Sequence, residues 1–172
     1  KELTQAVDTV TQAQQDTNKP LAIILAGHNG SGKSTMWRER LSARLQIPLV
    51  NADRMMMSIL PEVGPKSPLP DWALRLRDED QGWMAVAQRG VQAFVAEAAR
   101  VGVPFAMETV FSHWKDRGDG TFESKIDNIR QLQDAGYFVL LFFVGLESRD
   151  MSILRVQTRV AEHGHAVDPA KL

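Results

Sequence analysis

Apolar runs of strand length alternate along this chain with segments whose apolar residues recur at helical spacing. The runs cover residues 21–27, 47–51, 104–107 and 137–144, and the last of them is continuous enough for a strand buried on both faces of a sheet. Helical spacing predicts helices over residues 2–16, 33–45, from about 54, around 84–98, around 126–132 and over 148–163. Strands that alternate with helices predict an α/β domain with a mainly parallel sheet flanked by helices, in three layers.

The first strand leads into a glycine-rich segment that fits the pattern G-x-x-x-x-G-K-[ST]. The segment consists of Gly27, His28, Asn29, Gly30, Ser31, Gly32, Lys33, Ser34 and Thr35. It lies between a buried strand and a helix whose Trp37, Leu41 and Leu45 form one apolar stripe, and this position predicts a phosphate-binding loop. We therefore expect a P-loop NTPase-type fold that binds a nucleoside triphosphate.

The roles within this loop follow from backbone geometry and charge. The three glycines of the pattern allow successive N–H groups to point into one concave nest. The following helix adds its unpaired N-terminal donors and the positive end of its dipole. We expect Lys33 to face the phosphates rather than the core and to reach the β- and γ-phosphates. We expect Ser34 to ligate Mg²⁺, and Thr35 to cap or pack in the first helical turn.

Polar residues follow two further strands, at the sheet edge where parallel α/β sheets bind their ligands. Asp53 follows the second strand, where it could take the proton of an attacking hydroxyl or hold a water on the metal. It could instead cap the helix that starts near Arg54. Glu108 and Thr109 follow the third strand, and Glu108 could bind Mg²⁺ through water or accept hydrogen bonds from a substrate.

The predicted last helix carries two arginines, Arg155 and Arg159, at i,i+4 spacing on one face. Like charges at this spacing repel each other unless an anion lies between them. The pair could therefore clamp a transferred phosphate, because phosphoryl transfer depends chiefly on electrostatic stabilisation. The alternative is a solvated basic face.

The remaining helical segments leave alternatives open. The stripe of the N-terminal helix, within residues 1–18, could pack on the domain or bind a partner; it consists of Leu3, Val7, Val10 and Ala13. The methionines at 55–57 are expected to pack in the core rather than to contact substrate. The mixed charges over residues 75–80 are expected to form a solvated face.

Two segments are predicted to be irregular. Residues 60–70 contain four prolines and a glycine, which exclude regular structure. Residues 111–120 are expected to form a loop with a turn at 118–120, and within it His113 and Trp114 are expected at the surface.

Composition sets outer limits on function. A length of 172 residues predicts one domain, with a core that needs no disulfides, and the chain has no cysteine. A net charge of −1 gives no general attraction to nucleic acid or membranes. No apolar run reaches the length of a transmembrane helix and the N-terminus lacks a signal-peptide pattern, so the cytoplasm is the expected location.

The phosphate loop together with four later segments resembles the zeta-toxin family of small kinases. These segments are residues 50–53 (Val-Asn-Ala-Asp), 107–109 (Met-Glu-Thr), 143–146 (Phe-Val-Gly-Leu) and 155–167, which begins Arg-Val-Gln-Thr-Arg. The resemblance spans about residues 20–170 in order. The loop alone is generic, whereas the later segments together are fairly specific.

The resemblance implies a kinase that uses ATP or GTP to phosphorylate a sugar hydroxyl of UDP-N-acetylglucosamine, which poisons cell-wall synthesis. It implies that Asp53 is the base, that Glu108 and Thr109 hold the sugar, and that the arginines close on the phosphates. Many such toxins are silenced by a small helical antitoxin, so a partner of this kind is expected here.

Two features depart from the family pattern. His163 replaces the first glycine of the usual Gly-Gly-His, and the chain ends at Leu172, before the arginine-rich stretch and final strand that the resemblance leads us to expect. Two alternatives stay open. One is a kinase of another hydroxyl, on a nucleic-acid end or a nicotinamide dinucleotide, although the neutral charge and lack of an aromatic-basic patch disfavour nucleic acid. The other is a nucleotide-binding regulatory module.

Overall fold

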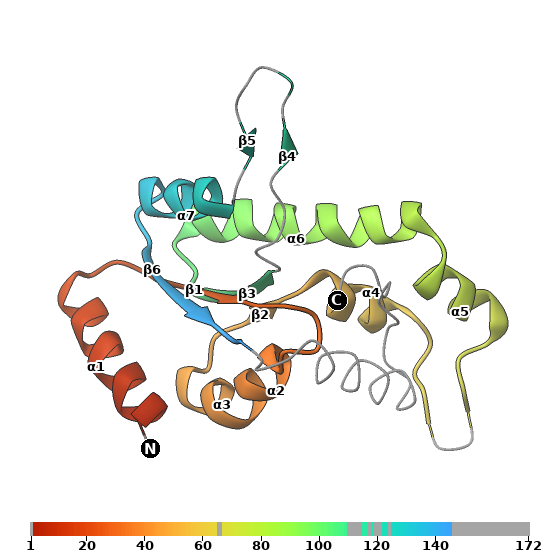
Figure 1. Ribbon diagram of the computed structural model, residues 1–172, viewed down its shortest axis with the longest axis horizontal. Coiled ribbons are helices and arrows are strands. Elements are labelled where there is room, and N and C mark those ends of the chain that lie inside the picture. Colours follow the sequence, from red (N-terminus) through yellow and green to blue (C-terminus); the bar gives the residue numbers. More distant parts are fainter. Residues whose placement is uncertain are drawn as a thin grey trace.

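The computed structural model describes residues 2–64, 67–109, 115–116, 118, 122–123 and 125–145, and Figure 1 shows their arrangement. The predicted last helix, with Arg155 and Arg159, lies outside these residues. So do His113 and Trp114. The elements described below belong to the remaining part of the chain.

The centre of the fold is a four-stranded sheet in the order β2-β3-β1-β6, in which every pair of neighbours is parallel. Its strands are β1 (Leu21–Ala26), β2 (Leu49–Val50), β3 (Phe105–Thr109) and β6 (Phe138–Phe143). A parallel pair requires a crossover between its strands, which is why the sequence alternates strands with helices. The predicted α/β class with a mainly parallel sheet is confirmed.

Helices cover both faces of this sheet, which gives the predicted three layers (Figure 1). One face packs on α1 (Glu2–Asp16) and on the helical segment after the loop, made of α2 (Lys33–Met36), the π-helical η1 (Trp37–Leu41) and α3 (Ser42–Leu45). The other face packs on α6 (Gln81–Val101) and α7 (Lys125–Asp134). Two further helices, α4 (Ala52–Ile59) and α5 (Asp71–Asp78), lie between β2 and α6 in the chain.

The apolar pattern explains why β1 lies inside the sheet. All of its side chains are buried, with Ile23 and Leu25 in the cluster on one face and Ala22 and Ile24 in the cluster on the other. Strand β6 differs from the expectation of burial on both faces, since Leu141 is 44% and Phe143 is 66% exposed. Within the described sheet β6 pairs only with β1, so it is an edge strand there.

The expected helical faces are largely found in the core. Trp37 and Leu41 are buried after the phosphate loop, Val7 of α1 packs in the same cluster, and Met56 of α4 is fully buried. The N-terminal helix therefore packs on the domain through its apolar stripe, although Ala13 at its far end is exposed. An ion pair between Asp8 and Arg44 joins α1 to α3.

Two expectations about charged and irregular segments are wrong in part. The charges over residues 75–80 are not all solvated, because Arg77 of α5 is 7% exposed and its guanidinium donates two hydrogen bonds of 2.8 Å to Asp78. The region expected to be a loop, residues 111–120, contains one short strand, β4 (Lys115–Asp116). This strand pairs antiparallel with β5 (Phe122–Glu123), which follows that region. The described residues of the segment 60–70, which are 60–64 and 67–70, are irregular as expected, apart from an isolated bridge between Gly64 and Ser67.

One side-chain hydrogen bond of the core, from Tyr137, can be tested by substitution. The Tyr137 hydroxyl donates a 2.7 Å hydrogen bond to the Val103 carbonyl, while its ring meets the Phe105 ring edge-on at 5.5 Å. Tyr137→Phe keeps the ring but removes the donor, so the free energy of unfolding should fall by about 0.5–1.5 kcal/mol in urea denaturation. An unchanged unfolding midpoint would show that this hydrogen bond contributes nothing.

Candidate functional site

The phosphate loop joins the carboxyl end of β1 to the first turn of α2. Gly27 has φ +151°, and a Cβ there would lie 2.3 Å from the Val144 carbonyl oxygen and 2.9 Å from Ser31 Oγ. Val144 is held in place because its N–H donates a 2.7 Å hydrogen bond to the Ala26 carbonyl. The close passage of the chain after β6 therefore admits only glycine at position 27. Gly30 and Gly32 also have positive φ angles, 76° and 91°, as a concave nest requires.

The ammonium group of Lys33 lies over this loop rather than in solvent. Its Nζ donates hydrogen bonds of 2.8 Å to the Gly27 carbonyl and 2.7 Å to the His28 carbonyl. The side chain is 7% exposed, so it faces the loop rather than solvent. The ammonium group therefore lies against the loop backbone, where it could bind a phosphate held in the loop.

The hydroxyl of Ser34 and the carboxylate of Glu108 meet at the sheet edge, although they lie far apart in the sequence. Ser34 Oγ donates a 2.8 Å hydrogen bond to Glu108 Oε1, and Asn51 Nδ2 donates a 2.7 Å hydrogen bond to Glu108 Oε2. The strand order explains this meeting, because β3 lies between β1 and β2 with Glu108 level with Leu25. Both oxygens of the Glu108 carboxylate are thereby engaged by residues that follow the neighbouring strands.

This arrangement fits a magnesium ion. Mg²⁺ prefers hard oxygen ligands and, in nucleotide sites, takes one or two from the protein and the rest from water and phosphates. Ser34 and Glu108 offer a hydroxyl and a carboxylate at one point beside the loop. In the part of the chain that the structure describes, no group of three or more His, Cys, Asp or Glu residues could hold a metal. A dedicated all-protein cage is therefore not the kind of metal site that these residues make.

Asp53 lies in the first turn of α4, three residues after the end of β2, as the second residue of the helix. The N-cap of this helix is Asn51, whose Oδ1 accepts a 3.1 Å hydrogen bond from the Arg54 N–H. The alternative role of Asp53 as the cap is therefore wrong. Among the described residues, no hydrogen bond or ion pair engages the half-buried Asp53 carboxylate, which leaves it available to a ligand.

Thr109 is the last residue of β3 and is level with Ala26, so it lies at the edge of the sheet from which the phosphate loop begins. Its side chain is half-buried. Thr35 is exposed in the first turn of α2. The structure thus brings Lys33, Ser34 and Glu108 to one edge. Sequence reasoning missed Asn51, although its position directly after a strand and three residues before Arg54 is typical of an N-cap.

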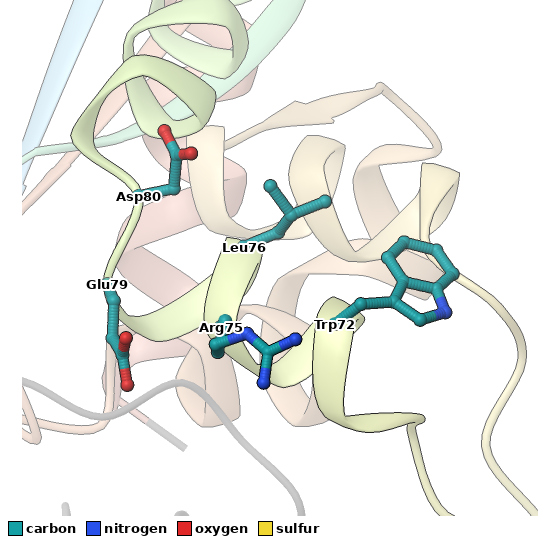
Figure 2. Close-up of a pocket in the computed structure, with 5 residues that line it drawn as sticks. All are labelled: Trp72, Arg75, Leu76, Glu79 and Asp80. Carbon is teal, nitrogen blue, oxygen red and sulfur yellow. The ribbon is translucent and has the colours of Figure 1, made fainter.

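A separate hollow of about 500 Å³ lies on α5 and the turn to α6 (Figure 2). Its lining residues are Trp72, Arg75, Leu76, Glu79 and Asp80. Trp72 is half exposed there, and Asp80 Oδ1 accepts a 2.8 Å hydrogen bond from the Trp83 N–H as the N-cap of α6. None of the residues predicted to bind nucleotide, metal or acceptor lines this hollow, so it is distinct from the edge around the loop.

Comparison with known proteins agrees with this geometry. The family model described as Zeta toxin matches residues 4–171. The chain belongs to the zeta toxin family. This membership, together with the phosphate loop on a parallel sheet, supports a P-loop kinase.

Three relatives show how far the similarity extends. A protein of Haemophilus influenzae, described only as uncharacterized, is 28% identical over 146 residues, which are 85% of each chain. A structure of the PezAT chromosomal toxin-antitoxin system of Streptococcus pneumoniae aligns with a TM-score of 0.61 and 20% identity, covering 94% of this chain and 62% of that one. The Pnkp1/Rnl/Hen1 RNA repair complex aligns with a TM-score of 0.59 and 15% identity, covering 89% and 42%. At these identities the two structures establish the fold alone.

The loop geometry predicts the effect of removing its lysine. Lys33→Ala should weaken ATP and GTP binding in calorimetry by roughly 10- to 100-fold, because a hydrogen bond to a charged group is worth about 1.5–3 kcal/mol. The exposed Lys19 provides the matched control, and Lys19→Ala should bind as the wild type does. Equal nucleotide affinity in the wild type and in Lys33→Ala would refute the phosphate-loop assignment.

Proposed function

We propose that this chain is a small-molecule kinase that transfers the γ-phosphate of ATP or GTP to a hydroxyl of a nucleotide sugar. The observation that carries the proposal is the Glu108 carboxylate, which joins Ser34 of the phosphate loop to Asn51, two residues before Asp53. A donor site, a metal carboxylate and a free acid are thereby grouped on one sheet edge. UDP-N-acetylglucosamine is the first candidate acceptor, on the strength of family membership.

In the proposed reaction the acceptor hydroxyl oxygen forms a bond to the γ-phosphorus while the bond from that phosphorus to the β–γ bridging oxygen breaks. ADP or GDP leaves, and Asp53 takes the proton of the attacking hydroxyl. Lys33 exchanges its hydrogen bonds to the Gly27 and His28 carbonyls for bonds to the β- and γ-phosphates. Mg²⁺, held by Ser34 and through water by Glu108, would neutralise charge on the phosphates.

Charge favours a small acceptor over a nucleic-acid end. A kinase of polynucleotides uses a broad basic surface, whereas this chain has a net charge of −1. The likeness to an RNA repair complex is the observation that keeps a nucleic-acid end as the second candidate. Thr109 and Glu108 supply a neutral and an acidic group at this edge, which suit sugar hydroxyls and amides better than phosphodiesters. Arg155 and Arg159 are proposed to add the cations that a diphosphate requires.

We also propose that the kinase is the toxin of a toxin–antitoxin pair. A structural neighbour comes from the PezAT toxin-antitoxin system, and family membership supports the same biology. The partner would be a small helical antitoxin. In the described residues the apolar stripe of α1 is occupied by the chain's own core through Val7, so the antitoxin would have to contact other surface.

The corrected position of the helix cap sharpens the test of the proposed base. Because Asn51 and not Asp53 caps α4, Asp53→Asn removes the proton acceptor without removing the cap. Nucleotide binding should persist in calorimetry, while single-turnover transfer should fall by about 10²–10⁴-fold, as is typical for loss of a general base. Transfer at the wild-type rate would exclude Asp53 as the base.

The acceptor can be identified directly. Enzyme, Mg²⁺ and ATP or GTP are incubated with UDP-sugars, nicotinamide dinucleotides and 5′-hydroxyl oligonucleotides, and mass spectrometry detects the gain of one phosphate. We expect a phosphorylated UDP-sugar. Phosphorylated oligonucleotide with every sugar unchanged would replace the proposal with the second candidate. Nucleotide binding without any phosphorylated product would favour a regulatory module.

A further inference from the structure

The side chain of Asn51 makes two hydrogen bonds of opposite polarity. Its Oδ1 accepts the Arg54 N–H at 3.1 Å, and its Nδ2 donates to Glu108 Oε2 at 2.7 Å. The partners fix the orientation of the amide, since a backbone N–H can only donate and an ionised carboxylate can only accept. One residue therefore connects the start of α4, which carries Asp53, to the carboxylate beside the phosphate loop.

The second bond determines how Glu108 faces the loop. With Oε2 held by Asn51, the other oxygen, Oε1, is directed to the Ser34 hydroxyl at 2.8 Å. Among the described residues, the Glu108 carboxylate accepts hydrogen bonds from Ser34 and Asn51. A hydrogen bond from Ser34 alone would leave the carboxylate free to rotate. Two donors on the two oxygens instead define the plane of the carboxylate.

We propose that Asn51 is a positioning residue for the metal, which orients Glu108 so that Oε1 faces the ion beside Ser34. The inference rests on the proposed function, because it assumes that Mg²⁺ binds between the loop and Glu108. Partners that orient a metal-holding group in this way typically affect metal affinity by 10- to 100-fold when they are removed. The alternative is a purely structural role, in which Asn51 serves only as the N-cap of α4.

Asn51→Ser separates the two roles. Serine caps helices about as well as asparagine, so the bond to Arg54 is retained, but its shorter side chain cannot reach Glu108. ATP binding is measured by calorimetry over a series of Mg²⁺ concentrations, without any acceptor. In Asn51→Ser the Mg²⁺ concentration that gives half of the maximal rise in ATP affinity should increase by about 10- to 100-fold. The melting temperature should fall less than in Asn51→Ala, because serine retains the cap.

Controls distinguish the possible failures. Asn51→Ala loses the cap as well, so it should show the same Mg²⁺ defect with a lower melting temperature. Lys19→Ala, at an exposed position outside the site, should leave the Mg²⁺ titration unchanged. A wild-type Mg²⁺ requirement in Asn51→Ser would overturn the inference while leaving the proposed kinase intact. A wild type whose ATP binding is indifferent to Mg²⁺ would instead refute the metal site of the proposed function.

A double-mutant cycle keeps the inference testable if Asn51→Ser itself is poorly folded. If Asn51 acts through Glu108, replacing it in a Glu108→Gln background should add little to the Mg²⁺ requirement, because the shared contact is already lost. Asn51→Thr, which also keeps a capping oxygen, serves as the second variant in the same cycle. Fully additive effects in this cycle would show that Asn51 does not act through Glu108 and would overturn the inference.

Discussion

The candidate site depends on the register of β3 between its two neighbours. Glu108 is level with Leu25 of β1, and Met107 is level with Val50 of β2, so the residues just beyond these strands converge on the same carboxylate. A slip of one residue would turn Glu108 to the opposite face of the sheet and separate it from Ser34 and Asn51. The register is fixed by the core, because Phe105 and Ala106 of β3 are fully buried. Packing in the sheet therefore places the proposed metal carboxylate.

The same sheet also shapes the phosphate loop. Strand β6 pairs with the full length of β1, and the chain that leaves it brings the Val144 carbonyl to within 2.3 Å of where a Gly27 side chain would begin. The loop backbone then encloses the Lys33 ammonium through the Gly27 and His28 carbonyls. A triphosphate that replaces these carbonyls as the partner of Lys33 would bind to an ammonium group that is already ordered. This lowers the conformational entropy lost by the side chain on binding.

Much of this architecture could be predicted from the sequence, because it follows from local patterns. The motif at Gly27 and the buried run before it predict the loop. The position of Glu108 at the same edge of the sheet follows because the carboxyl ends of parallel strands lie at one edge. The missed features depend on tertiary contacts. Leu141 and Phe143 are exposed at the carboxyl end of β6, and Asn51 takes the cap that Asp53 was equally able to supply. The choice between Asn51 and Asp53 as the N-cap depends on the residue at which β2 ends. Pairing with β3 determines that residue.

The most direct measurement is a crystal structure of the chain with Mg²⁺ and a non-hydrolysable triphosphate. The account predicts phosphates inside the loop, with Lys33 Nζ moved from the Gly27 and His28 carbonyls onto them. It also predicts the metal beside Ser34 Oγ and Glu108, and the Asp53 carboxylate facing the γ-phosphate. A triphosphate bound away from the loop, or an Asp53 carboxylate turned away from the γ-phosphate, would contradict it.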